Sequence, residues 1–361
     1  MIMHRNKKAW WILVACAVLV KLFSLFPGAV ETYYSNGIYQ FTSRLQRLIL
    51  GWIPFSIGDI LYCVVIIWLL VKLFRFIKTI AKRRANGAFW KNALLWCCFW
   101  SLFVYTAFNI LWGLNYNRQG MAQQMQLNMQ RYSKEELIAV LQTVMQRINE
   151  TADSSLKTRD AYLKKSGLFA EAIQSYQQAQ PAFKHLSYKT SSVKPSLFSY
   201  LGDYLGYTGY YNPITGEAQV NTTVPVFLRP FTTCHEIGHQ LGYAKENEAN
   251  FAGYLSAKSS GDPAFRYSVY YDLYSYGIRE LYFNDSTAAL QLSKHIHPQV
   301  KKDYKALNDF YDRFQNPIEP LIRTLYGQYL RANEQPGGMR SYSEVMAFMV
   351  AYYKKYGAGA L

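Results

Sequence analysis

The chain has 361 residues, of which 50% are hydrophobic and 17% aromatic, and it carries a formal net charge of +16. This composition is too apolar for a disordered protein, and it shows no repeat of the kind that builds fibres. The positive charge is unevenly distributed, since residues 1–113 hold 13 Lys or Arg and 2 Asp or Glu, whereas residues 114–361 hold 26 and 21. Because the excess charge coincides with long apolar runs, it indicates a membrane protein rather than one that binds nucleic acid.

Three apolar stretches in the N-terminal third have the length of membrane spans. They cover Ala9 to about Val30, Ile57 to about Phe76, and Ala93 to Leu114. A helix needs roughly 20 residues to cross the hydrocarbon core. The first stretch is interrupted by Lys21, and a basic segment followed by an apolar run is also typical of a cleaved signal peptide. An uncleaved span is preferred, because no small-residue cleavage site is evident near Pro27.

The basic residues of the short loops predict which side of the membrane each part faces. They are concentrated before the first span, where Arg5 and Lys7 lie, and in the segment KRRANGAFWK after the second span. Loops rich in Lys and Arg stay in the cytoplasm, so the N-terminus is expected inside and the chain after the third span outside. The sequence therefore predicts a multi-pass protein of the cytoplasmic membrane, with a three-helix anchor over 1–114 and an extracytoplasmic domain over 115–361.

The segment between the first two spans has a pattern of its own. From Ile38 to Ile53, Arg44 and Arg47 stand among apolar residues at helical spacing. This pattern is typical of an amphipathic helix that lies at a membrane surface. Its place between the first two spans predicts the outer surface.

The rest of the chain is predicted to be mainly helical with a small sheet. Ser133–Glu136 has the form of a capping box and precedes an apolar run at helical spacing. Residues 187–222 are instead rich in Gly, Pro, Ser, Thr and Tyr, and they predict two or three short strands with a turn at 212–216. Further helices are expected at 168–178, 267–283, 298–314, 321–332 and 343–356, the last with a second capping box at Ser341–Glu344.

The segment HEIGH carries the pattern with the most chemical content. On a helix, His235 and His239 stand one turn apart on the same face, so both imidazoles can reach one Zn²⁺. Glu236, next to the first of them, can take a proton from a water at the metal. Pro230 favours a helix start before the motif, and Gly242 favours a stop after it.

A catalytic zinc site needs a third protein ligand and keeps one position open. The chain does not continue as a metzincin, because Lys245 stands where that class has its third His. A helix that begins near residue 244 places Glu246 on the same face as Asn250, whose amide can hydrogen-bond a ligand imidazole. Glu246 is therefore preferred as the third ligand, with Glu248 as the alternative.

Several segments together resemble known proteins. ENEAN at 246–250 resembles the E-x-x-A-D helix of gluzincin membrane peptidases, with Asn in place of Asp. The chain as a whole is similar to an uncharacterised bacterial family of three-span, membrane-anchored, zinc-peptidase-like proteins. The segments that carry this similarity are PFSIGDILY at 54–62, YNPITGEAQVN at 211–221, HEIGHQLGYAKENEANF at 235–251 and RSYSEV at 340–345. The resemblance implies a zincin-like α+β metallopeptidase domain, but it implies no particular substrate.

In zincin folds, an edge strand just before the active helix holds an extended peptide by main-chain pairing. The segment GEAQVN occupies that place in the chain order, and its residues are Gly216, Glu217, Ala218, Gln219, Val220 and Asn221. The same pattern fits an ordinary hairpin equally well. His295 with His297, or Arg340, are further candidates for contact with the substrate, although HIHPQ is more typical of a loop.

The sequence thus favours a membrane-anchored zinc metallopeptidase that hydrolyses peptide bonds outside the cytoplasmic membrane. The expected cofactor is Zn²⁺, and the expected partners are the lipid bilayer and a peptide or protein substrate in the cell envelope, with no nucleic acid. The alternative is a non-catalytic membrane receptor or assembly factor that uses a zincin-like domain as a binding module. Glu236 argues against this alternative, because a structural zinc site requires ligands but no general base.

Overall fold

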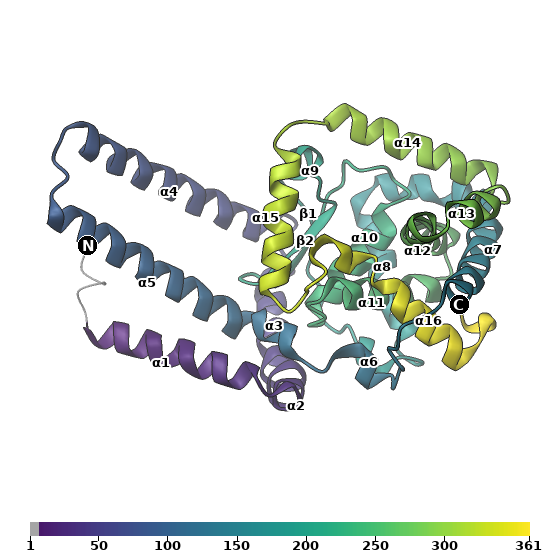
Figure 1. The fold of residues 1–361 in the computed structure, drawn as a ribbon, viewed down its shortest axis with the longest axis horizontal. Helices are drawn as coiled ribbons and strands as arrows, with labels where there is room; N and C mark the ends of the chain where they lie inside the picture. The colour runs from purple at the N-terminus through teal and green to yellow at the C-terminus, as the bar shows by residue number, and fades with distance from the viewer. Residues whose placement is uncertain (1–6) are drawn as a thin grey trace.

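A computed structural model describes residues 7–361, so the predicted cytoplasmic signal at Arg5 lies outside the described residues. The N-terminal third is helical almost throughout. Its elements are α1 (Lys7–Ser24), α2 (Pro27–Ala29), the π-helical η2 (Val30–Ile38), α3 (Tyr39–Leu50), α4 (Ile57–Ala81) and α5 (Gly87–Leu111). Helices α1, α4 and α5 project together from one end of a larger, mainly helical domain (Figure 1).

Two of these helices, α4 and α5, are long and apolar enough to cross a membrane. Most side chains of α4 are exposed, as expected for a helix whose neighbours are lipid tails. Helix α1 qualifies only together with Pro27–Leu50, to which it is joined through a bend of 100°. By length and composition, the described residues thus contain two helices that could cross a membrane, or three if the bent pair forms one span, which indicates association with a membrane.

The helices of the larger domain begin where the local signals are satisfied. Ser133 caps α7 (Lys134–Thr158), because its hydroxyl accepts from the Glu136 N–H while the Glu136 carboxylate accepts from the Ser133 N–H. This capping box was predicted and is confirmed. The second predicted capping box, Ser341–Glu344, is wrong. Ser341 lies within a 3₁₀ turn, η6 (Gly338–Tyr342), and α16 (Val345–Tyr356) begins without a side-chain cap.

The other helices of the domain are α6 (Gly120–Gln124), α8 (Lys165–Ala179), α9 (Ser199–Leu205), α10 (Arg229–Gln240), α11 (Glu246–Ser259), α12 (Pro263–Asn284), α13 (Ser286–Ser293), α14 (Pro298–Phe314) and α15 (Glu319–Ala332). The predicted helices at 168–178, 267–283, 298–314 and 321–332 are confirmed as α8, α12, α14 and α15. Short 3₁₀ turns connect several of them; these are η3 (Gly113–Asn117), η4 (Arg159–Leu163), η5 (Lys184–Leu186) and η7 (Ala358–Ala360).

A small mixed sheet accompanies these helices. Its strands are β1 (Val193–Pro195), β2 (Gly209–Asn212) and β3 (Glu217–Val220), in the order β1-β3-β2. Strand β3 pairs parallel with β1 and antiparallel with β2, in the registers Val193↔Ala218 and Asn212↔Glu217. The predicted turn between β2 and β3 is confirmed, because Asn212 Oδ1 accepts from the backbone N–H groups of Ile214 and Thr215.

Helix α10 lies at the centre of the domain, and every one of its residues is buried. It packs against α8, α11, α12 and the sheet. Glycines permit the closest approach to α11. A Cβ on Gly253 would lie 3.0 Å from the backbone nitrogen of His235, and one on Gly238 would lie 3.1 Å from the carbonyl oxygen of Ala249. Small residues on both helices therefore let α10 and α11 approach each other closely.

Residues 30–59 belong to the packing of the domain, although they fall within the predicted anchor. Glu31 forms a buried ion pair with Arg118, with 2.7 Å between the nearest nitrogen and oxygen. At the end of α10, the Gln240 carbonyl oxygen accepts from Arg47 Nη1 at 3.1 Å. The predicted boundary at the end of the third span therefore does not separate two independent packing units.

The start of α4 is bound by a buried carboxylate of the sheet. Glu217 accepts hydrogen bonds from the N–H groups of Ile57 and Gly58, at 3.1 and 2.8 Å, and from the Ser56 hydroxyl at 3.1 Å. A carboxylate at this position satisfies amide donors that have no partner within the helix, and it interacts favourably with the helix dipole. A membrane helix and the central strand are thereby fixed to each other.

Candidate metal centre

The chain reverses direction directly after the motif helix α10. Gly242 has a φ of +91°, a conformation that L side chains rarely adopt, and its N–H donates to the His239 carbonyl oxygen. A Cβ at this position would also lie 3.0 Å from Cε1 of Tyr39. The predicted helix stop at Gly242 is confirmed. The reversal brings Glu246, the first residue of α11, over the face of α10 that carries the two histidines.

Both motif histidines have their Nδ1 atoms engaged. Nδ1 of His235 lies 2.7 Å from Asn250 Oδ1, and Nδ1 of His239 lies 2.8 Å from the Tyr243 carbonyl oxygen. Because both partners are acceptors, each ring holds a proton on Nδ1, which leaves Nε2 as the nitrogen that is available to a metal ion. The hydrogen bond predicted between Asn250 and an imidazole is therefore present.

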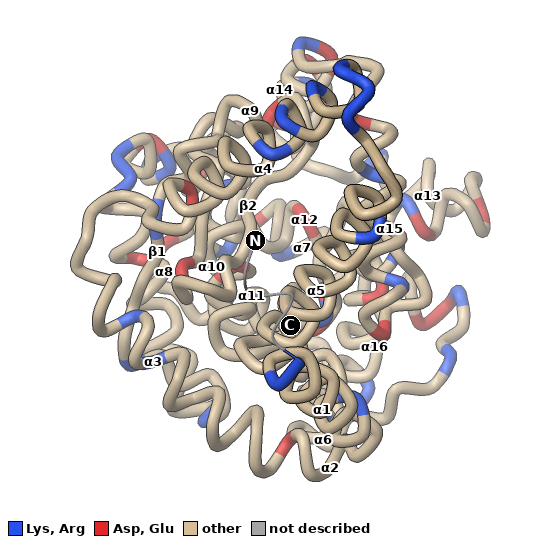
Figure 2. Tube along the Cα trace, turned by 90° about the vertical axis from the view of Figure 1, so that its left-hand side faces the viewer, with Lys and Arg blue, Asp and Glu red and all other residues tan. Residues whose placement is uncertain are grey.

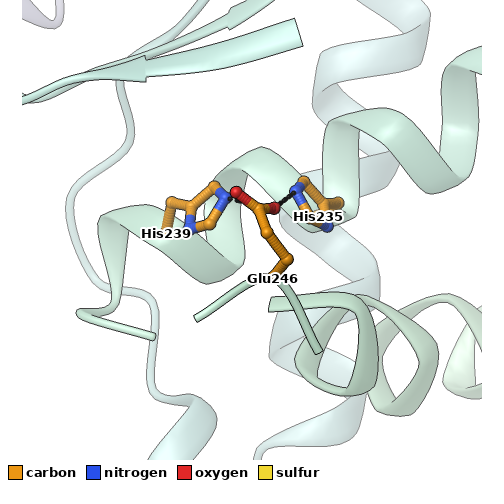
Figure 3. A group of neighbouring side chains, drawn as sticks. All are labelled: His235, His239 and Glu246. Carbon is orange, nitrogen blue, oxygen red and sulfur yellow. Dashed lines mark ion pairs between the residues drawn. The ribbon is translucent and has the colours of Figure 1, made fainter. Parts of the chain in front are cut away.

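Glu246 points its carboxylate between the two imidazoles (Figure 3). Its Oε2 lies 3.3 Å from Nε2 of His235 and 3.5 Å from Nε2 of His239. A tetrahedral zinc ion with bonds of about 2.0–2.1 Å holds its donor atoms about 3.3 Å apart, so these spacings fit a single ion. Oε2 is buried and makes no hydrogen bond within residues 7–361, while Oε1 accepts from the Tyr326 hydroxyl at 2.9 Å. A cation would provide the missing partner of Oε2.

Glu248, the alternative ligand, faces another part of the domain. Its Oε1 accepts from the backbone N–H of Met121 at 3.2 Å, and burial raises the pKa of its carboxyl. Among the described residues, the group that could share a metal ion consists of His235, His239 and Glu246. The structure therefore brings Glu246, and not Glu248, to the two imidazoles.

The surroundings of the cluster favour positive charge next to the carboxylate. Burial alone would lower the pKa of His239, but the nearby negative charge of Glu246, with a smaller effect of Glu236, raises that pKa to about 9. Burial likewise acts to raise the pKa of Glu246, yet the two imidazoles hold it well below its usual range. A divalent cation at the Nε2 atoms would meet the same electrostatic preference in place of the protons.

Glu236 lies beside the cluster without belonging to it. Burial raises the pKa of its carboxyl to about 7, against the lowering effect of His235 and His239. Its Oε2 makes no hydrogen bond in the described part of the chain. The carboxylate packs against β2, where a Cβ on Gly209 would lie 2.6 Å from Oε1, so only a glycine leaves room for it. An ionisable group held in this way can exchange a proton with a molecule bound at the cluster.

The prediction of an edge strand at Gly216–Asn221 is wrong. Strand β3 is the central strand, so its main-chain groups are paired on both sides. A peptide cannot add to a strand that has no free edge. The side chains of Glu217 and Gln219 are also engaged, because both bond to Ser56 at the start of α4. Within the described residues, β2 is paired on one side only, and it is the strand that contacts Glu236.

Two tyrosines at the cluster were not predicted. The Tyr342 ring stacks on the His235 imidazole, with 6.1 Å between centroids and 21° between planes, and its carbonyl oxygen accepts from Asn250 Nδ2 at 3.0 Å. Tyr326 bonds the carboxylate of Glu246 from α15. The chain has 31 tyrosines, and only the RSYSEV segment gave Tyr342 a distinguishing context.

The residues that directly follow α5 reach the same helix. The Trp112 ring lies 5.8 Å from the His239 ring, and its Nε1 donates to the His239 carbonyl oxygen at 3.4 Å. The Tyr39 hydroxyl donates to the neighbouring Gln240 carbonyl oxygen at 3.0 Å. The C-terminal end of α10, which carries His239, is therefore in contact with the segments that connect the projecting helices to the domain.

The remaining sequence candidates lie elsewhere. His297 contacts α7 and not the cluster. Its backbone N–H donates to the Asn149 side chain, and its Nε2 lies 3.6 Å from the Asp153 carboxylate. The His295 carbonyl oxygen bonds to the same Asn149 side chain. Arg340 lies in η6 with an exposed side chain.

Fold and site define a mainly helical, membrane-associated protein with a small mixed sheet and a buried cluster of two histidines and a glutamate. The chain belongs to the family described as "Protein of unknown function (DUF3810)", whose model matches residues 34–350. The match begins within η2, so it includes α3, α4 and α5 together with the domain. No curated protein and no solved structure matches the chain.

Proposed function

We propose that the protein is a membrane-anchored zinc metallopeptidase that hydrolyses peptide bonds outside the cytoplasmic membrane. In this proposal, α1, α4 and α5 form a three-helix anchor, and the chain after α5 forms a zincin-like domain. The supporting observation is the position of Glu246 Oε2 between the Nε2 atoms of His235 and His239, with Glu236 beside them, whose Oε2 makes no hydrogen bond within residues 7–361. Three protein ligands leave one position of a tetrahedral ion open, which is typical of catalytic rather than structural zinc.

Each residue of the cluster then has a chemical role. Zinc, when bound, supplies the Lewis acidity that polarises the scissile carbonyl group and makes a water more acidic. Glu236 takes a proton from the attacking water and delivers it to the leaving amide nitrogen. Asn250 and the Tyr243 carbonyl hold the two imidazoles in orientation, and Tyr326 does the same for Glu246. The unpaired edge of β2 offers main-chain groups to an extended peptide next to Glu236.

Hydrolysis by the full-length protein tests this proposal. The protein in phosphatidylcholine vesicles is incubated with a mixed peptide library, and new peptide termini are detected by mass spectrometry. We expect cleavage that a chelator abolishes and added Zn²⁺ restores. If no peptide is cleaved while the zinc-loaded protein captures an intact polypeptide from the library, the alternative of a binding module is correct instead.

The metal content provides a first prediction. The purified full-length protein should carry about one Zn²⁺ per chain, as expected for a single three-ligand site. His239→Ala should lose most of the zinc, because two protein ligands rarely hold it. His295→Ala is the matched control and should retain it, because His295 contacts Asn149 of α7 and does not belong to the cluster. Full occupancy in the His239 variant, measured by atomic emission, would place the metal elsewhere.

The orientation in the membrane provides a second prediction. The basic residues before α1 and between α4 and α5 predict that Leu361 lies outside the cytoplasm. A reporter that fluoresces only in the cytoplasm should therefore be silent when fused after Leu361. The same reporter inserted after Asn86, in the loop between α4 and α5, should be bright. The reverse pattern would contradict a site outside the membrane.

A further inference from the structure

Helix α3 is amphipathic in the opposite sense to a surface helix of a soluble domain. Two of its polar side chains face the protein: Arg47 is 2% exposed and bonds to the Gln240 carbonyl, and Gln46 Nε2 donates to the Pro213 carbonyl at 2.9 Å. Its large apolar side chains face outward instead. Those of Phe41, Leu45 and Leu48 are between 43% and 69% exposed. The domain therefore leaves much of this apolar face uncovered.

Two further helices present apolar side chains at the same end of the domain. Leu201 on α9, and Leu321 and Leu325 on α15, are between 50% and 58% exposed. Helices α3, α9 and α15 lie around the point where α1, α4 and α5 leave the domain (Figures 1 and 2). Seen along the projecting helices, the three surround them on different sides.

The exposed faces are continuous with the membrane helices. Only residues 51–56 separate α3 from α4, and this connection carries Trp52, which is largely exposed. Tryptophan is enriched at the level of the lipid headgroups, where an apolar ring and a polar N–H are both accommodated. Arg44, also exposed on α3, can interact with lipid phosphates from the same level.

We propose that Phe41, Leu45, Leu48, Leu201, Leu321 and Leu325 form an apolar collar that is seated in the headgroup region of the bilayer crossed by α4 and α5. The occupant is lipid, because the collar surrounds helices that are apolar enough to span a membrane and its apolar side chains point away from the protein. An isolated soluble domain would be expected to keep such a patch small, whereas an interfacial helix requires it.

The position of the collar also indicates a substrate class; this inference rests on the proposed function. The cluster is near the collar, since Trp112, directly after α5, contacts His239, and Tyr326 of α15 bonds Glu246. A domain seated on the bilayer would hold the catalytic groups close to the membrane surface. We infer that the substrate class is polypeptide segments that are themselves tethered to the membrane by a lipid or by a neighbouring span.

Photo-crosslinking of the full-length chain tests the collar without reference to activity. Benzoylphenylalanine is placed at Leu45 or Leu325, and the protein is irradiated in phosphatidylcholine vesicles. Val65, exposed on α4, is the positive control, and Leu290, exposed on α13 at the other end of the domain, is the negative control. We expect lipid adducts at the two collar positions and at Val65, and none at Leu290.

The other outcomes overturn the proposal. Lipid adducts at Val65 alone would show that the collar is exposed to water and does not contact lipid. Adducts between two chains at Leu45 or Leu325 would show that a second copy covers the collar in place of lipid. Zinc content, measured on each variant, shows whether the domain has folded.

A comparison of two substrates tests the inferred substrate class. The same cleavable peptide is supplied either free or attached to a phospholipid in the vesicles that hold the protein. The parent should cleave the attached form faster, and Leu45→Glu with Leu48→Glu should reduce that advantage by about tenfold. Leu290→Glu should leave it unchanged. Equal rates on both peptides would refute the substrate class, whereas no cleavage of either peptide would refute the proposed function and leave the crosslinking result standing.

Discussion

Replacing Glu236 by Gln is expected to lower the rate of peptide hydrolysis by about 10²–10⁴-fold, the usual contribution of a general acid–base group. The amide has the same size and the same preference for a helix, but it cannot take a proton from water. Zinc should remain at full occupancy, because Glu236 is not among the three residues whose ligand atoms lie within 4.8 Å of one another. The measurement is kcat/KM on a single library-derived peptide, together with zinc per chain.

An exposed glutamate on α7 provides the control for the Glu236 variant. Glu135→Gln, an exposed carboxylate in the first turn of α7, should change neither activity nor metal content. Loss of zinc in the Glu236 variant would show that this carboxylate is a ligand. Unchanged hydrolysis with full zinc would show that another group accepts the proton.

Replacing Glu246 by Gln should release the metal. The change removes the negative charge that lies between the two Nε2 atoms and that holds positive charge at this site. Loss of an outer hydrogen-bond partner already costs 10–100-fold in metal affinity, and the loss of a charged ligand should cost about 10²-fold or more. Zinc affinity is measured by competition with a chromogenic chelator, and hydrolysis should fall in parallel.

Glu248→Gln is the matched control, two residues further along the same helix. An amide oxygen can still accept from the Met121 N–H, and burial already disfavours the charged form of this carboxyl. The variant should therefore bind zinc like the parent. If Glu248→Gln loses zinc while Glu246→Gln keeps it, the roles of the two residues must be exchanged.

The sequence was sufficient for those parts of the site that depend on local geometry. His235 and His239 share a helical face, and the reversal at Gly242 returns the chain within a few residues, so Glu246 and Asn250 could be placed by helical periodicity alone. The helix expected near residues 298–314 is also present, as α14.

Contacts between distant segments could not be predicted in this way. Strand β3 is central because β1, a strand of three residues, pairs with its outer side, and so short a strand leaves little signal in a sequence. Tyr326 and Tyr342 reach the cluster from the C-terminal part of the chain, and no spacing links them to the motif. The sequence pattern placed Arg47 on the polar face of a membrane-surface helix. Its buried position could not be predicted, because its partner, Gln240, lies far away in the sequence.

The bonds that tie α3 and α4 to the domain determine which piece of the chain can stand alone. A fragment that starts at residue 115 would lack the partners of the Glu217 carboxylate, the Gln240 carbonyl and the Arg118 guanidinium. Each buried polar group deprived of its partner costs about 1–3 kcal/mol, and a whole domain is stable by only about 5–15 kcal/mol. Cutting the chain there would remove part of the folding unit, so the protein has to be expressed, purified and assayed together with its long apolar helices α4 and α5.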